Sequence, residues 1–480
     1  MENKWLSQRY SAPVTRISHK ARKQLVENLE AEVRPFFSEK ELDQLAKECQ
    51  FVQRENTCKL TGSTFFDLVI FNKEKLKEQS LNGLCIKLKE DQGIEIKKQS
   101  LHERFNENAV LFLAKALEKL LLQQLVSDLP LTTFKSFNRV LIKDSVCFQL
   151  NPSLAKDYPG SGGSGSEAAI RIQFEYDLLS GKIIDLSINS FNSQDAKNST
   201  ATLHLTEEGD LIIRDLAYMH VSALKELIKK GASFICRPNS NINIYELKHD
   251  GFVEINFVKT KRYMNKNNLS FIEKDVYIGS QEKLQVRLIL HLMPEEELAK
   301  RLRKANKNSK KKGRKNVSKK YKARAAFNLF ITNADQEEIP AEQVWPIYRL
   351  RWQIELIFKI WKSICHVDKV KKVIKERFEC YLYAKLIFIV LGWQIVWATA
   401  GHLFRQQQKA LSFFKAFKTL FNEKMEAIRD VFVLGKQSAK TFMVQFYDLS
   451  KEYHLLEKKK QSLSSIEILL MITTNCKLNP

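Results

Sequence analysis

The sequence predicts a mixed α/β fold, in which a central sheet is covered by helices, interrupted by a β-rich insertion and flanked by helical N-terminal and C-terminal regions. Three observations lead to this prediction. Short apolar strands that end in an acid occur at 139–144 and 210–215. Strand-forming residues fill most of the interval between them and a strongly apolar helix at 348–362. Helical periodicity dominates both ends of the chain.

Composition sets the scale of the fold and the class of partner. The chain has 480 residues, which suggests two to four domains. A hydrophobic fraction of 44% with 30 Phe is ample for a large core and excludes global disorder. Lys and Arg number 78 against 55 Asp and Glu, a formal charge of +23. Such an excess points to a polyanion, either nucleic acid or an anionic membrane surface, without choosing DNA over RNA.

Cysteine usage and hydropathy indicate the compartment. The eight cysteines are scattered without a CxxC pair, which predicts reduced thiols rather than a disulfide or zinc framework. The N-terminus lacks the apolar segment of a secretion signal. The stretch Leu386–Ala400 is apolar but shorter than the roughly 20 residues of a membrane span, so we expect a buried helix. The sequence therefore favours a cytoplasmic protein without a membrane partner.

Residues 1–130 are predicted to be helical. Ser38 is followed three residues later by Glu41, a capping pattern for a helix start. Two short helices, 81–89 and 97–105, flank a turn that contains Gly93. This order is what a helix-turn-helix needs, with Lys, Gln, Ser and Arg on the second helix. Binding in a DNA groove and plain helix packing both explain it.

Residues 131–238 are predicted to form the first part of a sheet. A strand ends at Asp144, a hairpin follows, and a β-α-β unit then contains the strand that ends at Asp215. Sites in such sheets lie at the carboxyl ends of the strands, where both acids are expected. The Gly/Ser loop at 159–166 lacks the GK[ST] ending of a phosphate-binding loop and is interpreted as a flexible connection.

Residues 239–335 are predicted to be a β-rich insertion with strands near 241–245, 252–258, 275–278, 285–290 and 327–332. Its segment 300–324 holds 14 Lys or Arg and no acid. This composition predicts a mobile basic loop that contacts a DNA backbone without sequence preference. The candidate contacts are Lys310, Lys311, Lys312 and Arg314.

The segment Tyr348–Lys362 is predicted to be one helix. Tyr348, Arg351, Glu355 and Lys362 are separated by three, four and seven residues, so they share one stripe. The other positions are mostly apolar, which places the helix in the interior, where a charge must be paired or bound to metal. One carboxylate flanked by Arg, Lys and Tyr can hold a cation while its neighbours bind phosphate. An ordinary amphipathic helix with a solvated face would explain the helix taken alone.

The chain resembles a large group of bacterial insertion-sequence transposases over roughly residues 130–370. The resemblance is carried by this Tyr-(2)-Arg-(3)-Glu-(6)-Lys spacing together with the two upstream aspartates. It implies a DDE enzyme with a ribonuclease H-like core, whose final part is 336–375, followed by a helical region at 376–480. Asp144, Asp215 and Glu355 map onto the acidic triad of that group. Tyr218 matches a tyrosine that commonly follows the second acid, whereas Leu216 and Ala217 depart from the commonest residues.

The resemblance also implies chemistry and partners. The three carboxylates would hold Mg²⁺ or Mn²⁺, as two ions roughly 4 Å apart that activate the attacking and leaving oxygens. Tyr348, Arg351, Lys362 and Arg237 would contact DNA, and Tyr263, Tyr277 or Phe271 would stack a flipped base if one forms. The expected substrates are double-stranded terminal repeats and target DNA, cut and joined by a dimer in a paired-end complex beside the bacterial nucleoid, with cut-and-paste favoured. The alternatives are a ribonuclease H-like nuclease or resolvase, and a catalytically inactive transposase-derived DNA-binding protein.

Overall fold

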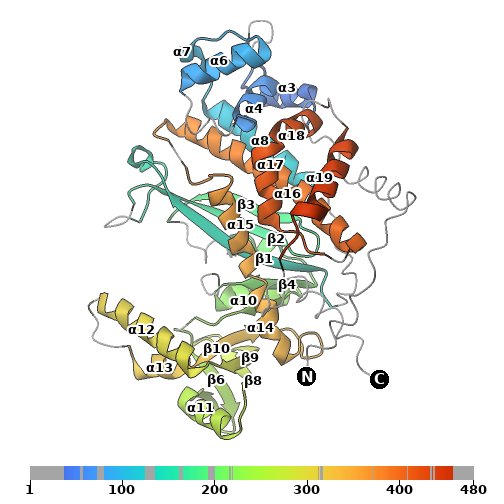
Figure 1. The fold of residues 1–480 in the computed structure, drawn as a ribbon. Helices are drawn as coiled ribbons and strands as arrows, with labels where there is room; N and C mark the ends of the chain where they lie inside the picture. Colours follow the sequence, from blue (N-terminus) through green and yellow to red (C-terminus); the bar gives the residue numbers. More distant parts are fainter. Residues whose placement is uncertain are drawn as a thin grey trace.

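The structure is a computed structural model in which one long sheet lies between a helical body and a smaller group of helices (Figure 1). It describes residues 37–53, 58–72, 80–124, 136–161, 166–192, 200–215, 218, 220–239, 241–311, 313, 317–369, 371–407, 409–432, 435 and 438–457. The predicted mixed α/β fold is confirmed.

The first half of the sheet has the order β3-β2-β1-β4-β5. Its strands are β1 (Arg139–Gln149), β2 (Ala169–Asp177), β3 (Ile183–Ser190), β4 (Asp210–Arg214) and β5 (Ser233–Cys236). β1, β2 and β3 are antiparallel neighbours, whereas β4 and β5 run parallel to β1. The helix α10 (Val221–Lys229) makes the crossover between β4 and β5. A three-stranded meander followed by parallel strands is the ribonuclease H-like arrangement that the resemblance implied.

The insertion extends this sheet instead of packing as a separate unit. Its strands are β6 (Ile244–Lys248), β7 (Gly251–Glu254), β8 (Phe271–Ile278), β9 (Leu284–Leu292) and β10 (Phe327–Thr332). β10 pairs antiparallel with β5 through Ile331 opposite Cys236, and the order continues as β10-β9-β8-β6-β7. The result is one ten-stranded sheet. The last part of the predicted core, residues 336–375, therefore continues from the end of β10.

The insertion also contains helices that the sequence analysis missed. They are α11 (Phe257–Lys266), α12 (Glu295–Lys311) and α13 (Lys319–Ala325). The prediction of a mobile basic loop is therefore wrong for most of 300–324. Arg301 explains why α12 is held in place, because its guanidinium donates to the carbonyl oxygens of Ala325 and Phe327. Ser318 caps α13. Lys312 and Arg314 lie outside the described residues.

The two helical ends of the chain pack on one another above the sheet (Figure 1). The N-terminal helices are α3 (Glu39–Glu48), α4 (Gly62–Ile70), α6 (Leu81–Gln92), α7 (Lys98–Glu103) and α8 (Glu107–Leu122). The C-terminal helices are α16 (Lys375–Gln407), α17 (Phe413–Glu423), α18 (Met425–Phe432) and α19 (Ala439–Tyr453). Short 3₁₀ turns occur at Pro152–Leu154 and Leu203–Leu205. An ion pair between Asp67 and Arg429 joins α4 to α18.

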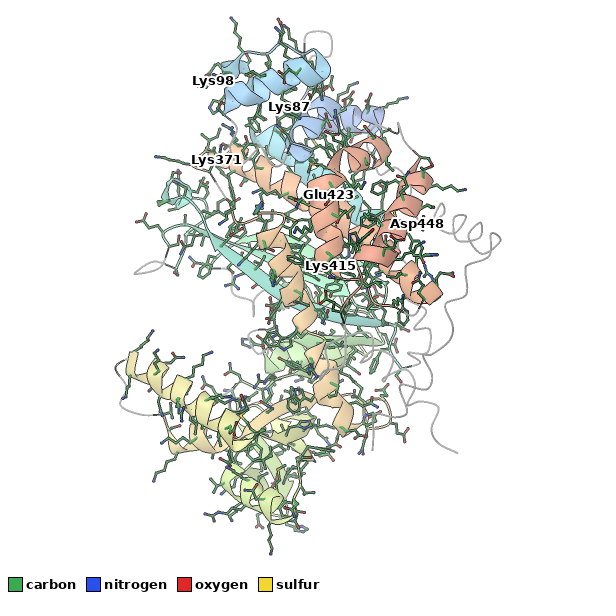
Figure 2. All side chains as sticks on the ribbon, viewed as in Figure 1. Lys87, Lys98, Lys371, Lys415, Glu423 and Asp448 are labelled. Carbon is green, nitrogen blue, oxygen red and sulfur yellow. The ribbon has the colours of Figure 1, made fainter. Side chains whose placement is uncertain are left out.

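Several local predictions in these regions are confirmed. Ser38 and Glu41 form the expected capping box. Gly93 adopts the left-handed conformation, with φ of 67°, that ends α6 before α7 begins. Lys87 and Lys98 lie on this helix pair (Figure 2). α16 is long and apolar enough to cross a membrane by length and composition, yet 94% of its most apolar window is buried inside this structure, as in a core helix.

Candidate active site

Asp144 and Asp215 lie side by side on neighbouring strands. β1 and β4 run in parallel and pair as far as Lys143 opposite Arg214, so the next residue on each is one of the two acids. The prediction that the first strand ends at Asp144 is wrong. β1 continues to Gln149 because β2 pairs with it beyond the point where β4 stops. Asp144 therefore sits in the middle of a strand, at the end of its pairing with β4.

The third acid comes from a helix pair rather than from one helix. Tyr348 belongs to α14 (Ala341–Arg349) and Glu355 to α15 (Trp352–Ser363), with a turn at Leu350 and Arg351 between them. The prediction of a single helix over 348–362 is corrected accordingly. The physical cause is a tightened turn, in which the backbone amide of Arg351 bonds to the carbonyl of Tyr348 three residues earlier. Both turn residues keep right-handed helical angles, so the polar stripe survives.

Arg351 and Tyr348 join the three acids. One guanidinium nitrogen of Arg351 lies 3.0 Å from Oδ2 of Asp144, and another lies 2.9 Å from Oε1 of Glu355. The Tyr348 hydroxyl donates to Oδ1 of Asp215 over 3.3 Å. The Arg351 side chain is 7% exposed, whereas Glu355 reaches solvent. Side chains from three distant segments thus meet at one place, as the sequence predicted.

The other predicted DNA contacts divide between near and remote positions. Lys362 donates to the carbonyl of Cys147, three residues beyond Asp144 on β1, over 3.2 Å. Arg237 follows β5 and is close enough to lower the pKa of Tyr348. Lys310 and Lys311 are exposed in the last turn of α12, in the insertion, and belong to a different part of the fold from the acids.

Two exposed side chains on α15 depart from the predicted interior position. Trp352 is 55% exposed, and Leu356 is similarly open. The Arg351 guanidinium lies 5.3 Å from the centre of the Trp352 ring. The apolar surface of this helix is therefore only partly in the core, and part of it borders the acids.

Burial and mutual repulsion govern the charge of Asp144. The pKa of Asp144 is raised to about 6, chiefly by burial and to a smaller extent by the nearby charges of Asp215 and Glu355. A hydrogen bond from the Ser145 amide and the charge of Arg351 act in the opposite direction. The pKa of Tyr348 is also raised, chiefly by burial and then by Asp215. These effects show that the three carboxylates lie within electrostatic range of one another.

The carboxylates have the right chemistry for Mg²⁺, which prefers hard oxygen ligands. Among the described residues, however, no three His, Cys, Asp or Glu side chains converge closely enough to form a ready-made metal site. The geometry gives the reason, because Arg351 stands between Asp144 and Glu355. The carboxylates of Asp144 and Glu355 are thus bridged by the Arg351 guanidinium.

A buried network on the opposite face of the sheet was not predicted from the sequence. The Lys143 ammonium is fully buried and contacts Glu175, Asp185 and the Thr202 hydroxyl at 2.8–3.2 Å. Arg214 donates to the other oxygen of Glu175 over 2.9 Å. The sequence does contain an indication of this network, because a Lys and an Arg directly precede the two strand acids in otherwise apolar strands. Because side chains alternate across a strand, these cations must face away from the acids.

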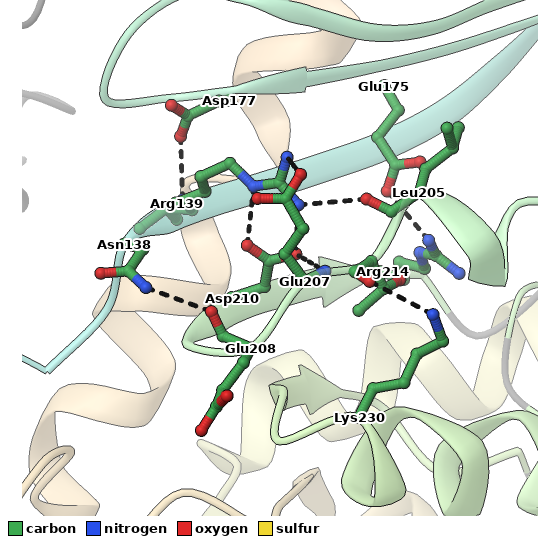
Figure 3. Close-up of polar contacts among 12 residues, drawn as sticks. Asn138, Arg139, Glu175, Asp177, Leu205, Glu207, Glu208, Asp210, Arg214 and Lys230 are labelled. Atoms are coloured by element: carbon green, nitrogen blue, oxygen red, sulfur yellow. Dashed lines mark hydrogen bonds and ion pairs between the residues drawn. The ribbon is translucent and has the colours of Figure 1, made fainter.

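Competing acids in the same region have structural roles. Asp210, at the start of β4, accepts two hydrogen bonds from the Arg139 guanidinium at the far end of the strands (Figure 3). Asp177 accepts from the amides of Val140 and Leu179 and holds the hairpin turn. Both acids therefore stabilise the fold and lie outside the group of Asp144, Asp215 and Glu355.

The residues after Asp215 retain one of the expected features. The Tyr218 hydroxyl donates to Oε1 of Gln173 over 2.7 Å and is buried beside β2. Leu216 and Ala217, which depart from the commonest pattern, lie outside the described residues. The tyrosine thus acts as a packing and hydrogen-bonding element close to the second acid.

Comparisons with known proteins agree with this geometry. The transposase DDE domain family matches residues 135–391. The chain is 32% identical over 448 residues to the transposase for insertion sequence element IS231F of Bacillus thuringiensis subsp. israelensis, covering 90% of this chain and 91% of that protein. It is 30% identical to the transposase for insertion sequence element IS1151 of Clostridium perfringens, covering 92% and 96%. With a matched core that contains all three acids, the chain belongs to the DDE transposases of bacterial insertion sequences.

Proposed function

We propose that Asp144, Asp215 and Glu355 are the catalytic carboxylates of this transposase. The observation that supports this assignment is the convergence of the three acids from β1, the end of β4 and α15 on the Arg351–Tyr348 pair. DDE transposases generally use divalent metal ions, and these three acids would hold Mg²⁺ or Mn²⁺, as two ions. Such ions supply activation of the attacking oxygen and stabilisation of the leaving oxygen during phosphodiester cleavage and strand transfer.

The cationic side chains around the acids are proposed to position the DNA. Arg351 can bind a phosphate bidentately, and Lys362 can act as a point charge beside it. Tyr348 and Arg237 flank the same place and would contact the terminal phosphates.

A second DNA contact is proposed on α12, which replaces the predicted loop. Its exposed cations recur at a spacing of three or four residues and therefore share one face of the helix, about 16 Å long at 1.5 Å per residue. They are Lys300, Arg303, Lys304, Lys307, Lys310 and Lys311. Lys312 and Arg314 follow directly in the sequence and would extend the contact. A row of this kind suits a phosphate backbone and carries no sequence information.

The proposed reaction is transposition of the chain's own element in the bacterial cytoplasm, beside the nucleoid. Residues 1–130, which include α6 and α7, would bind the terminal repeats. Residues 131–238 and 336–375 would form the catalytic core around the insertion at 239–335. Cleavage of both ends in a paired complex of two protomers, followed by transfer of the 3′-OH, gives cut-and-paste transposition. The helices of 376–480 would support the N-terminal region, on which they pack.

The test is a cleavage and joining assay on DNA that carries the element's terminal repeats, with Mg²⁺ or Mn²⁺. Wild type should nick the repeat ends and give joined products, and Glu355→Gln should lose both while still binding DNA. Glu226→Gln is the matched control, because Glu226 is a half-buried acid on α10 that pairs with Lys229 on the same helix. Cleavage without joining would support a ribonuclease H-like nuclease, and binding without cleavage by wild type would support an inactive DNA-binding relative.

A further inference from the structure

Arg351 occupies the place between the acids that a cation is expected to take. Its side chain is almost fully buried, and it reaches Asp144 with one terminal nitrogen and Glu355 with the other. Its third nitrogen, Nε, is buried without a hydrogen-bond partner among the described residues. The guanidinium thus bridges the two carboxylates, and within the described part of the chain its Nε–H is left without a partner.

Both oxygens of Asp144 already accept a hydrogen bond from the protein. Its Oδ1 accepts the backbone amide of Ser145 over 2.8 Å, and its Oδ2 accepts Arg351 over 3.0 Å. Both carboxylate oxygens are therefore engaged by the protein itself. A metal ion bound to this carboxylate would lie beside the positive charge of Arg351, so the two cations compete for Asp144.

The neighbouring cation does not share this position. Lys362 donates to the Cys147 carbonyl, further along β1 than Asp144. Among the described residues, its ammonium forms no ion pair with a carboxylate. Lys362 is therefore a suitable control for Arg351, because each carries one positive charge and only Arg351 bridges Asp144 and Glu355.

We infer that Arg351 is the internal counter-ion of the resting site and that it must leave the carboxylates before they can bind metal. This inference rests on the proposed function. A DNA phosphate can draw the guanidinium away, because Arg binds phosphate oxygens in the same forked geometry that it uses for carboxylates. The unused Nε–H gives the guanidinium a further donor for that ligand. Metal binding then depends on DNA binding.

Linkage makes this dependence reciprocal. If DNA raises the affinity for metal by some factor, metal raises the affinity for DNA by the same factor, and such factors commonly lie at about 5- to 150-fold. Without DNA, the bridged acids bind metal weakly. The resting enzyme therefore does not assemble its metal ions before DNA is bound.

The test measures Mn²⁺ binding to the full-length protein by titration calorimetry in the absence of DNA. Arg351→Gln should bind Mn²⁺ about tenfold or more tightly than wild type, within the range of such coupling. Lys362→Gln removes the same charge without freeing a carboxylate and should change the affinity far less. Adding Glu355→Gln to Arg351→Gln should abolish the gain, which shows that the ion binds at this site.

A second measurement uses wild type with a duplex of the cleaved terminal repeat. The duplex should tighten Mn²⁺ binding by wild type and have little further effect on Arg351→Gln, in which the bridge is already absent. Arg351→Lys keeps the charge, cannot span both acids, and should give an intermediate affinity. It replaces Arg351→Gln if that variant does not fold.

Two results would overturn the inference. If folded Arg351→Gln binds Mn²⁺ no more tightly than wild type, Arg351 organises the acids instead of blocking them, and the proposed catalytic function still stands. If no variant shows binding that depends on Glu355, even with DNA present, the assignment of the acids as metal ligands fails together with this inference.

Discussion

The buried network behind the acids allows a quantitative prediction. Lys143 is fully buried, and Glu175 and Arg214 are nearly so, with Asp185 as the fourth charge. The four charges sum to zero. Burial alone would raise the pKa of Glu175, but the Arg214 and Lys143 charges more than offset it and hold that pKa below its usual value.

Glu175→Gln keeps the shape of the side chain and leaves a net buried positive charge. Removing one partner of a buried pair costs about 3–5 kcal/mol of folding free energy, because the remaining charge is neither solvated nor paired. The control is Glu207→Gln. Glu207 pairs with Arg139 but is 70% exposed, so its loss should cost about 0–1 kcal/mol.

Urea unfolding followed by tryptophan fluorescence measures both effects, since Trp361 and Trp393 are deeply buried and report on the core. Replacing Lys143 by Met together with Glu175→Gln restores neutrality. The double variant should therefore lose less than the sum of the single variants, by about 0.5–3 kcal/mol. Equal costs for Glu175→Gln and Glu207→Gln, or strict additivity, would refute the reasoning.

Three further predictions concern other parts of the molecule. Burial lowers the pKa of His402 to about 4, so the unfolded chain gains a proton below about pH 6.5 that the folded chain does not. Lowering the pH from 7 to 5 should cost wild type about 2 kcal/mol more than His402→Gln, as measured by urea unfolding at each pH. Gly181 has a φ of 74°, and a Cβ there would overlap the Trp397 ring, so Gly181→Ala should cost about 2–4 kcal/mol by the same assay. Replacing Lys304 and Lys307 by Gln should reduce the slope of log affinity against log salt by about 1.8, equally for terminal-repeat and random DNA; an unchanged slope would exclude α12 as a phosphate contact.

The sequence was sufficient for the features that follow from local pattern and register. Strands that end near an acid in a β-α-β order predicted that Asp144 and Asp215 would meet, and the β1–β4 pairing bears this out. The spacing of Tyr348, Arg351 and Glu355 predicted a shared stripe, which the structure also shows. Periodicity and strand order are local properties, and a short window of sequence contains them.

Features that depend on long-range contacts could not be predicted in this way. The basic segment resembles a mobile loop by composition, yet Arg301 anchors α12 to the end of α13 and the start of β10 by hydrogen bonds across more than twenty residues of chain. β1 passes beyond Asp144 because β2 continues to pair with it, which the residues after the acid do not reveal. In both cases a distant partner decides the local structure.

The tightened turn in the signature segment has a consequence for the site. In a 3₁₀ turn the side chains at positions i and i+3 eclipse each other, whereas in an α-helix they are offset. Arg351 therefore lies over Tyr348, with its guanidinium 6.0 Å from the centre of the ring. From this position Tyr348 reaches Asp215 while Arg351 reaches Asp144, so each strand acid has its own partner. In an unbroken α-helix the two side chains would still share a face but would be offset by about 60° around the axis. The break between α14 and α15 thus sets the resting geometry, and the same turn carries the arginine that DNA is proposed to displace.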